Sequence, residues 1–254
     1  AIAAPEGEPL PEVSIPVITL AAPRPALALL ASRLHGEPSR ALKLLGVTGT
    51  NGKTTVATLV ADMVAAAGMA PGLIGTNELR VGALAEPARF TTPEAPVLHG
   101  LLAQMRDAGV PVAAMEVSSV GLAEQRVFGC QFTAVAFTNL SPDHLDYHGH
   151  MAAYAAAKAR LFTEHPEALA VINVEDAYGA RLAAGRPNTW RVALDGRPAD
   201  VTVDGLAVDA RGWRGRLVTP AGAVDVRCPL LGRFNALNAV TAAALALAAG
   251  VPSE

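Results

Sequence analysis

The feature that most constrains the fold is an alternation of short apolar runs with helical stretches, which begins at Leu42. In chain order the segments are LKLLGV, a helix after Gly52, GLIGT, a helix from Glu94, VAAMEV, AVAFT, a helix from Met151 and ALAVINV. Alternation of this kind builds βαβ units, in which helices cover a parallel sheet. The sequence therefore predicts an α/β fold with a parallel sheet flanked by helices.

The pattern changes after Asn188. The segments RVAL, DVTVDGLAVDA, WRGRLVT and AVDVRC alternate with a period of two and are separated by Gly, Asp and Pro. We predict that they form a small antiparallel β-sheet appended to the parallel one. The chain then closes with NALNAVTAAALALAAG, a predicted helix that ends at Gly250 and Pro252.

The first residues differ from the rest of the chain because they are rich in proline. Within them, VSIPVITL predicts one edge strand that Pro16 interrupts. A chain of 254 residues that is 51% hydrophobic can bury one sizeable core. We expect residues 42–254 to form one central domain, residues 21–41 a linker, and residues 1–20 the remnant of an N-terminal domain.

Composition argues against several classes of protein. A net charge of -3 with 17% charged residues provides no basic field for nucleic acid. Cys130 and Cys228 lie far apart, so neither a disulfide framework nor a thiolate zinc site is expected. The first residues do not resemble a secretory signal, and the longest apolar run, residues 239–251, is too short to cross a bilayer. We expect a soluble, cytoplasmic protein that neither binds nucleic acid nor inserts into a membrane.

The strongest functional motif is GVTGTNGKTT, which follows an apolar strand and opens a long helix. A strand, a glycine-rich turn and a helix N-terminus present backbone N–H groups and a dipole to an anion. Lys53 can reach the β and γ phosphates of a nucleotide, and the Thr54 hydroxyl can bind Mg²⁺. A glycine-rich turn with an incidental lysine is the less favoured alternative. The predicted ATP-binding residues are Gly49, Thr50, Asn51, Gly52, Lys53, Thr54 and Thr55.

Further polar residues follow two predicted strands, where ligands bind in open parallel sheets. Glu116 ends the strand of VAAMEVSS, and an unpaired carboxylate there is costly, so Glu116 is a candidate metal ligand. The residues alone leave a metal site and a hydrogen-bonded polar loop as equal alternatives for FTNLSPDHLDYHG. That segment contains Asn139, Asp143, His144, Asp146 and His148. Lys158, in the helical run AYAAAKARLF, is by itself predicted to be a surface lysine.

Six motifs together resemble one family. GTNGKTT, FTTPEA, MEVSS, FTNLSPDHLDYHG, AAKARLF and GRFNALN occur in the order found in UDP-N-acetylmuramoyl-tripeptide synthetases of the Mur ligase family, and they span nearly all of residues 42–250. The resemblance implies that Lys53, Glu116, His144 and Lys158 are catalytic. It also implies that Glu116, His144 and Lys158 hold a second Mg²⁺, with Lys158 carbamylated so that it provides an oxygen ligand.

The same resemblance assigns residues that contact the nucleotide base and the acceptor substrate. Asn235 and Asn238, three apart at the start of the last helix, are implied to lie near adenine. Helix capping by Asn235 is the structural alternative. Thr91, Thr92, Ser118 and Arg126 are implied to bind the UDP-muramoyl-peptide. The family pattern SSHALxQxR is broken by Val120 and Glu124, which puts contacts by those two side chains in doubt.

The resemblance implies an ATP-dependent acid–amino-acid ligase of peptidoglycan synthesis. A substrate carboxylate would attack the γ-phosphate of ATP, and an amino group would convert the acyl phosphate into an amide. The expected partners are ATP, Mg²⁺, UDP-N-acetylmuramoyl-L-alanyl-D-glutamate and an amino acid, either meso-diaminopimelate or lysine. We expect the isolated chain to bind nucleotide without turnover, because in this family a C-terminal domain holds the amine. The alternatives are a folylpolyglutamate or cyanophycin-type ligase and a non-catalytic nucleotide-binding module.

Overall fold

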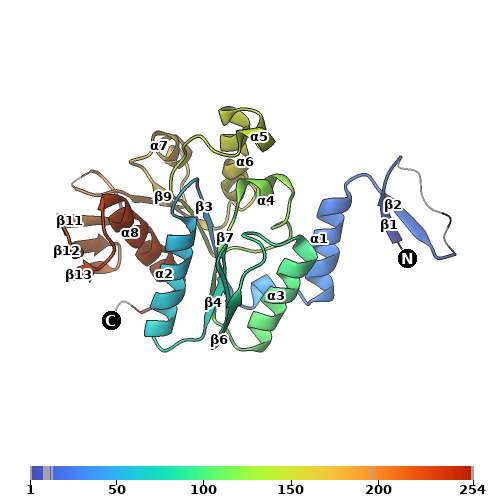
Figure 1. Cartoon of the computed structure of the whole chain (residues 1–254), viewed down its shortest axis with the longest axis horizontal. Coiled ribbons are helices and arrows are strands. Elements are labelled where there is room, and N and C mark those ends of the chain that lie inside the picture. Colours follow the sequence, from blue (N-terminus) through green and yellow to red (C-terminus); the bar gives the residue numbers. More distant parts are fainter. Residues whose placement is uncertain (1, 8–11, 13, 196, 253–254) are drawn as a thin grey trace.

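A computed structural model describes residues 2–7, 12, 14–195 and 197–252, and a sheet of eight strands forms its centre (Figure 1). In chain order these strands are β3 (Lys43–Thr48), β4 (Pro71–Ile74), β5 (Glu78–Val81), β6 (Leu84–Pro87), β7 (Val112–Glu116), β8 (Ala134–Phe137), β9 (Leu169–Asn173) and β10 (Thr189–Val192). Across the sheet they lie in the order β10-β9-β8-β3-β7-β4-β5-β6. All neighbours from β10 to β4 are parallel, and β5 and β6 add an antiparallel edge.

Helices cover both faces of this sheet, as predicted. The helices α2 (Lys53–Ala66) and α8 (Arg233–Ala248) share one hydrophobic core with one face. The helices α3 (Ala95–Asp107), α6 (Met151–Thr163) and α7 (Ala177–Ala183) share a second core with the other face. Successive strand residues point to opposite faces, so Leu44 and Leu45 of β3 belong to different cores. A strand that is apolar on both faces is typical of a buried parallel sheet.

The predicted antiparallel sheet exists, but one of its expected strands lies elsewhere. Its strands are β11 (Thr202–Asp209), β12 (Gly212–Thr219) and β13 (Gly222–Cys228), which lie beside α8 (Figure 1). The prediction for RVAL is wrong, because its first two residues, Arg191 and Val192, belong to β10 and pair in parallel with β9. The helix α7 connects β9 to β10 and completes one more βαβ unit. A period-two pattern shows that one face is buried but does not identify the neighbouring strand.

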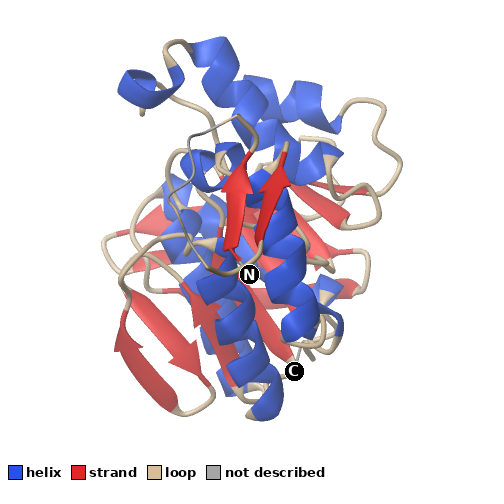
Figure 2. Ribbon diagram, turned by 90° about the vertical axis from the view of Figure 1, so that its right-hand side faces the viewer, coloured by secondary structure: helices blue, strands red, loops and turns tan. Residues whose placement is uncertain are grey.

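The segment that precedes the central sheet contains more structure than expected. The helix α1 (Pro23–Leu34) and a 3₁₀ turn, Pro38–Arg40, occupy the predicted linker. The strand β2 (Val17–Leu20) starts after Pro16 and pairs in parallel with β1 (Ile2–Pro5). This pair lies beyond α1, away from the main sheet (Figure 1), and it is in front of the other elements in Figure 2. The predicted edge strand is therefore shorter than VSIPVITL and belongs to a separate sheet, and its first residue, Val13, lies outside the described residues.

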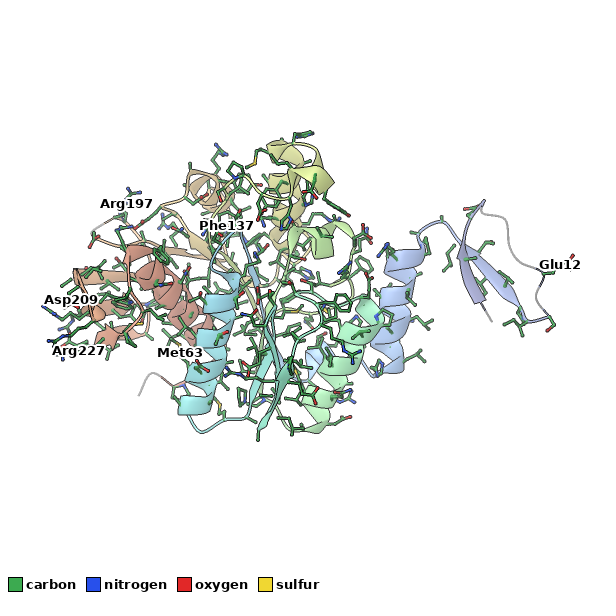
Figure 3. All side chains as sticks on the ribbon, viewed as in Figure 1. Glu12, Met63, Phe137, Arg197, Asp209 and Arg227 are labelled. Carbon is green, nitrogen blue, oxygen red and sulfur yellow. The ribbon has the colours of Figure 1, made fainter. Side chains whose placement is uncertain are left out.

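The carboxyl ends of the parallel strands bring the motif segments to one edge of the sheet. The loops that follow β3, β4, β7 and β8 meet there, together with α4 (Ser119–Ala123) and α5 (Leu145–His148). Phe137, the last residue of β8, lies in the interior near this edge, whereas Asp209 and Arg227 lie at the far rim of the antiparallel sheet (Figure 3). Among the described helices, none is both long enough and apolar enough to cross a membrane.

Candidate nucleotide and metal site

The predicted phosphate loop, residues 49–52 between β3 and α2, has a backbone that only glycine fits at two positions. Gly49 has φ 145° and Gly52 has φ 91°. A Cβ added at Gly49 would overlap Thr138 Oγ1, and a Cβ added at Gly52 would overlap Asn238 Oδ1. Gly52 directly precedes α2, and no described side chain caps the start of that helix. The N–H groups of the first turn, which includes Thr54 and Thr55, are therefore directed at whatever occupies the loop.

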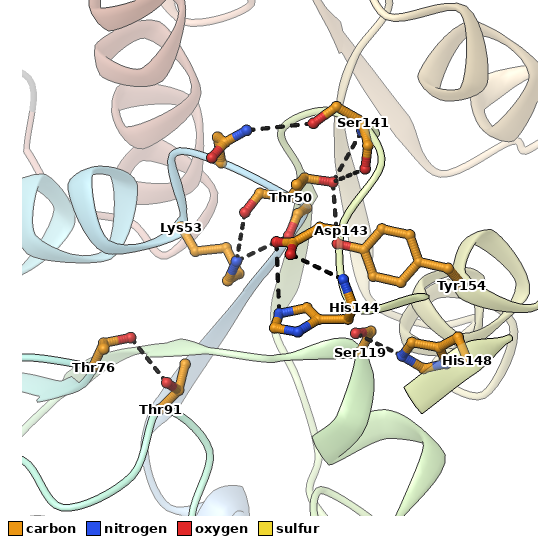
Figure 4. A network of polar contacts seen from close by, with 12 residues as sticks. Thr50, Lys53, Thr76, Thr91, Ser119, Ser141, Asp143, His144, His148 and Tyr154 are labelled. Carbon is orange, nitrogen blue, oxygen red and sulfur yellow. Dashed lines mark hydrogen bonds and ion pairs between the residues drawn. The ribbon is translucent and has the colours of Figure 1, made fainter. Parts of the chain in front are cut away.

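Residues after β8 hold this loop in place. The Thr138 hydroxyl donates to Asn51 O at 2.6 Å, and the Asn51 N–H donates to Asn139 Oδ1 at 3.0 Å. Thr50 Oγ1 lies 3.1 Å from the Tyr154 hydroxyl and accepts from the Ser141 N–H at 3.0 Å (Figure 4). Asn139, which the sequence placed only in a polar segment, therefore has a structural role as a partner of the phosphate loop.

Two lysines converge on one carbonyl oxygen of this loop. Lys53 Nζ donates to Gly49 O at 3.0 Å and to Thr50 O at 2.8 Å, and Lys158 Nζ donates to the same Gly49 O at 2.7 Å. Only 1% of Lys158 is exposed, and its ammonium lies 4.3 Å from the centre of the Tyr154 ring. The prediction of a surface lysine from AYAAAKARLF is wrong. Lys158 lies on the buried face of α6, together with Tyr154 and Leu161.

Burial also changes the protonation of both lysines. Loss of hydration, reinforced by the charge of Lys53, lowers the pKa of Lys158 to about 7, although Asp143 opposes the shift. Loss of hydration lowers the pKa of Lys53 as well, and the charges of Glu116 and Asp143 oppose that shift. These two amines share a small, poorly hydrated space, so the Lys158 amine is partly neutral near pH 7.

Glu116 ends β7 as a buried carboxylate, with 1% of the residue exposed. Its Oε2 accepts from Thr54 Oγ1 at 2.9 Å and from Thr76 Oγ1 at 3.1 Å. Its Oε1 accepts from the Thr76 N–H at 2.7 Å. A Cβ at Gly75 would lie 2.9 Å from Oε1, so glycine leaves the room that this carboxylate occupies. The sequence did not single out Thr76, and its only signal was its place as the last residue of the predicted strand GLIGT.

The segment that contains His144 is more open. His144 has φ 51°, its backbone N–H donates to Asp143 Oδ1 at 2.9 Å, and its ring nitrogen lies 3.6 Å from Asp143 Oδ2. His148 Nε2 lies 3.0 Å from Ser119 Oγ (Figure 4). In the described part of the chain, no three His, Cys, Asp or Glu side chains are gathered as a metal site. The ligand set of Glu116, His144 and carbamylated Lys158 therefore stays a prediction.

The four residues predicted to bind the acceptor lie together beside Glu116. Thr92 Oγ1 donates to Glu116 O at 2.9 Å and accepts from the Ser118 N–H at 3.0 Å. Thr91 Oγ1 lies 3.0 Å from Thr76 Oγ1. Arg126 donates to Thr92 O at 3.0 Å and forms a 2.8 Å ion pair with Glu94.

Glu124, which departs from the family pattern, has partners within the chain. It forms a 2.6 Å ion pair with Arg24 of α1 and accepts a hydrogen bond from the Tyr147 hydroxyl of α5. Arg24 also pairs with Glu94 at 3.3 Å. Glu124 thus connects α1 to α5 across the rim of the group formed by Thr91, Thr92, Ser118 and Arg126.

The two asparagines at the start of α8 lie next to the phosphate loop. Asn238 Nδ2 donates to Asn235 Oδ1 at 3.4 Å, and Asn235 Nδ2 donates to Leu231 O at 2.8 Å. Gly232 is the residue that precedes the helix, so the alternative in which Asn235 caps the helix is wrong. Asn238 also lies against Gly52, so its side chain faces the predicted nucleotide loop, and Asn235 is linked to that loop through its hydrogen bond with Asn238.

Known protein families provide the test of the resemblance. Residues 47–246 match the Mur ligase middle domain. The chain belongs to the Mur ligase family. It is 44% identical over 245 residues to the UDP-N-acetylmuramoyl-L-alanyl-D-glutamate–2,6-diaminopimelate ligase of Gloeobacter violaceus, an alignment that covers 96% of this chain and 50% of that protein. The chain thus spans about half the length of the relatives that it matches.

Solved structures agree with this assignment. A UDP-N-acetylmuramoyl-L-alanyl-D-glutamate–2,6-diaminopimelate ligase matches with a TM-score of 0.82 and 30% identity, over 95% of this chain and 51% of that one. The folylpolyglutamate synthase of Mycobacterium tuberculosis, in complex with ADP and AMPPCP, matches with a TM-score of 0.64 and 24% identity, over 89% of this chain and 59% of that one. The second likeness concerns the fold alone. The resemblance and the fold class predicted from the sequence are both confirmed.

Proposed function

We propose that this chain is the ATP-binding, phosphoryl-transferring part of a ligase that joins 2,6-diaminopimelate to UDP-N-acetylmuramoyl-L-alanyl-D-glutamate. The observation that carries the proposal is a continuous line of side-chain contacts, Thr54–Glu116–Thr76–Thr91. This line runs from the first turn after the phosphate loop to the group formed by Thr91, Thr92, Ser118 and Arg126. Phosphoryl transfer requires the nucleotide and the acceptor to lie next to each other, and this line of contacts joins the two places where they would bind.

ATP would bind with its phosphates over residues 49–55 and its adenine towards Asn235 and Asn238. Lys53 now donates to two loop carbonyls, and it would exchange them for phosphate oxygens when the nucleotide binds. The loop amides, the N-terminus of α2 and the Lys53 ammonium would then offset negative charge on the transferring phosphoryl group.

The residues near Glu116 suit Mg²⁺. A buried carboxylate and the Thr54 hydroxyl, 2.9 Å apart, are the hard oxygen ligands that this cation prefers. Thr54 and Glu116 would hold Mg²⁺, and His144 and Lys158 are the further candidates. When bound, the cation would supply positive charge beside the phosphate oxygens.

Lys158 would act as a carbamate. Its neutral amine would add to the carbon of CO₂ and release one proton, which gives an anionic N-carboxylate. The buried position beside Tyr154 and the lowered pKa support this reaction, because only an unprotonated amine is nucleophilic. Carbon-13 NMR of the protein in labelled bicarbonate is expected to reveal one carbamate signal, and Lys158→Arg is expected to abolish it. A signal that persists in the variant would refute the assignment.

The proposed reaction needs no nucleophile from the protein. The acceptor carboxylate would attack the γ-phosphorus of ATP and displace ADP, and the incoming amine would then displace phosphate from the acyl phosphate. The groups of this chain would orient the reactants and exclude water. Thr91, Thr92, Ser118 and Arg126 would hold the acceptor, and Arg126 would exchange its ion pair with Glu94 for a substrate anion.

Calorimetry separates this function from its nearest alternative. The chain is expected to bind a non-hydrolysable ATP analogue with Mg²⁺, and to bind UDP-N-acetylmuramoyl-L-alanyl-D-glutamate in preference to a folate. Preference for the folate would favour a folylpolyglutamate-type ligase. Absence of nucleotide binding would exclude both ligases.

A further inference from the structure

The Glu116 carboxylate is buried, yet its donors are neutral groups. Among the described residues it accepts three hydrogen bonds, of which two come from Thr76 and one from Thr54. The backbone N–H of Thr76 binds Oε1 at 2.7 Å and its hydroxyl binds Oε2 at 3.1 Å, so one residue contacts both carboxylate oxygens. This two-point contact restricts rotation of the carboxylate about its terminal bond.

The direction of the hydroxyl protons can be deduced. Thr76 Oγ1 lies within hydrogen-bond distance of both Glu116 Oε2 and Thr91 Oγ1, but a hydroxyl has one proton. An ionised carboxylate can only accept. The arrangement that satisfies every group has Thr91 donating to Thr76 and Thr76 donating to Glu116. The Thr91 hydroxyl therefore fixes the direction in which the Thr76 hydroxyl points.

We propose that Thr76 is a positioning residue that fixes the Glu116 carboxylate in the orientation needed for a divalent cation and its nucleotide, with Thr91 orienting the Thr76 hydroxyl. This inference rests on the proposed function. Carboxylates that bind a metal are themselves held by hydrogen bonds, and loss of such a partner typically weakens metal binding about 10- to 100-fold. The Thr76 side chain is exposed, so replacing it disturbs no core packing.

Thr76→Val and Thr76→Ser form a matched pair for the test. Valine has nearly the same shape as threonine but lacks the hydroxyl, whereas serine keeps it, and both keep the backbone N–H bond to Oε1. The measured quantity is the ratio of affinities for AMPPCP in Mg²⁺ and in EDTA, obtained by calorimetry on the chain. Thr163→Val, at the exposed end of α6, controls for a general effect of the substitution.

We expect Thr76→Val to lower this ratio about 10- to 100-fold, with the affinity in EDTA unchanged. Thr76→Ser is expected to restore most of the ratio, and Thr91→Val to lower it by less than Thr76→Val does. A merely structural role for Thr76 would move the thermal stability but not the ratio. If Thr76→Val does not fold, Thr76→Ala replaces it with the same expected result.

Three failures are distinguishable. If the unaltered chain binds AMPPCP in a Mg²⁺-dependent way and Thr76→Val retains the full ratio, the positioning role is wrong and the proposed function stands. If Thr91→Val lowers the ratio more than Thr76→Val does, the deduced direction of the protons is wrong. If the unaltered chain binds no nucleotide, the proposed function itself fails.

Discussion

The phosphate loop and the segment around His144 lie at the same edge of the sheet, but they differ in how firmly they are held. Tyr154 and Lys158, which support the loop, are 0% and 1% exposed, and Thr50 is 8% exposed. In the other segment, the side chain of His144 is 52% exposed and Tyr147 is 47% exposed. The loop therefore has its geometry before any ligand binds, whereas the position of His144 is fixed by few contacts.

This difference has an energetic consequence. Polar groups buried around the loop are costly to leave unpaired, so each change there is expected to cost more than a similar change at the surface. The exposed segment around His144 takes up its ligand-binding geometry only when a ligand binds, and the ordering that this requires reduces the net free energy of binding. Changes in residues 143–148 are thus expected to affect ligand binding more than they affect stability.

The largest effect is expected for the free energy of unfolding, which should depend on pH because Lys158 titrates differently in the folded and unfolded chain. Its pKa is about 7 in the folded chain and about 10.4 in an unfolded one. Between these values the unfolded state binds more protons, so the free energy of unfolding rises with pH. Relative to Lys158→Met, the unaltered chain is expected to gain about 4 kcal/mol between pH 7 and 10. Urea unfolding in CO₂-free buffer measures this, and parallel pH profiles for the two proteins would contradict it.

Nucleotide affinity provides the next largest effect. Lys53→Met removes a half-buried ammonium from the phosphate loop and is expected to weaken binding of AMPPCP with Mg²⁺ by about 3 kcal/mol, or more than 100-fold. Lys43→Met, at the exposed start of β3, is the matched control and is expected to change nothing. Calorimetry measures both. If His144→Ala weakened binding as much as Lys53→Met, the contrast between the two regions would fail.

Backbone constraint gives an effect of similar size, on stability instead of binding. Gly49→Ala places a Cβ on Thr138 Oγ1 at a φ of 145° and is expected to destabilise the chain by about 3 kcal/mol, from strain and overpacking together. Gly109→Ala is the control, because Gly109 also has a positive φ (71°) but nothing within 4 Å of the added Cβ. About 1 kcal/mol is expected there. Chemical denaturation measures both, and equal losses would show that the loop is not tightly packed.

Several parts of this site could be predicted from sequence because they depend on local pattern. Apolar runs located β3, β4, β7, β8 and β9 but not β5 and β6, and the spacing of Gly49, Gly52 and Lys53 identified the phosphate loop. Glu116 was found because it ends a buried strand. Each of these signals lies within a few residues of the feature that it predicts.

Other parts depend on which elements become neighbours, and local pattern does not contain that information. Lys158 is buried because its face of α6 meets the carbonyl of Gly49, more than a hundred residues away in sequence. Thr76 acquires its role because β4 lies parallel to β7, which places Thr76 over Glu116. The position of β10 was mistaken for the same reason, since its partner β9 lies beyond an unpredicted helix.

The smallest effects come from two tyrosines, which compare the regions directly. The Tyr154 hydroxyl bonds Thr50 in the buried region, and the Tyr147 hydroxyl bonds Glu124 at the surface. Tyr154→Phe leaves a buried acceptor with one partner fewer and is expected to cost about 1.5 kcal/mol of stability. Tyr147→Phe is expected to cost less than about 0.5 kcal/mol, because water replaces the lost bond.

Hydrogen exchange adds a local test: Tyr147→Phe should raise the exchange rate of the Gly149 amide, whose bond to Leu145 O closes α5. Equal stability losses for the two variants would mean that the exposed segment is held as firmly as the phosphate loop.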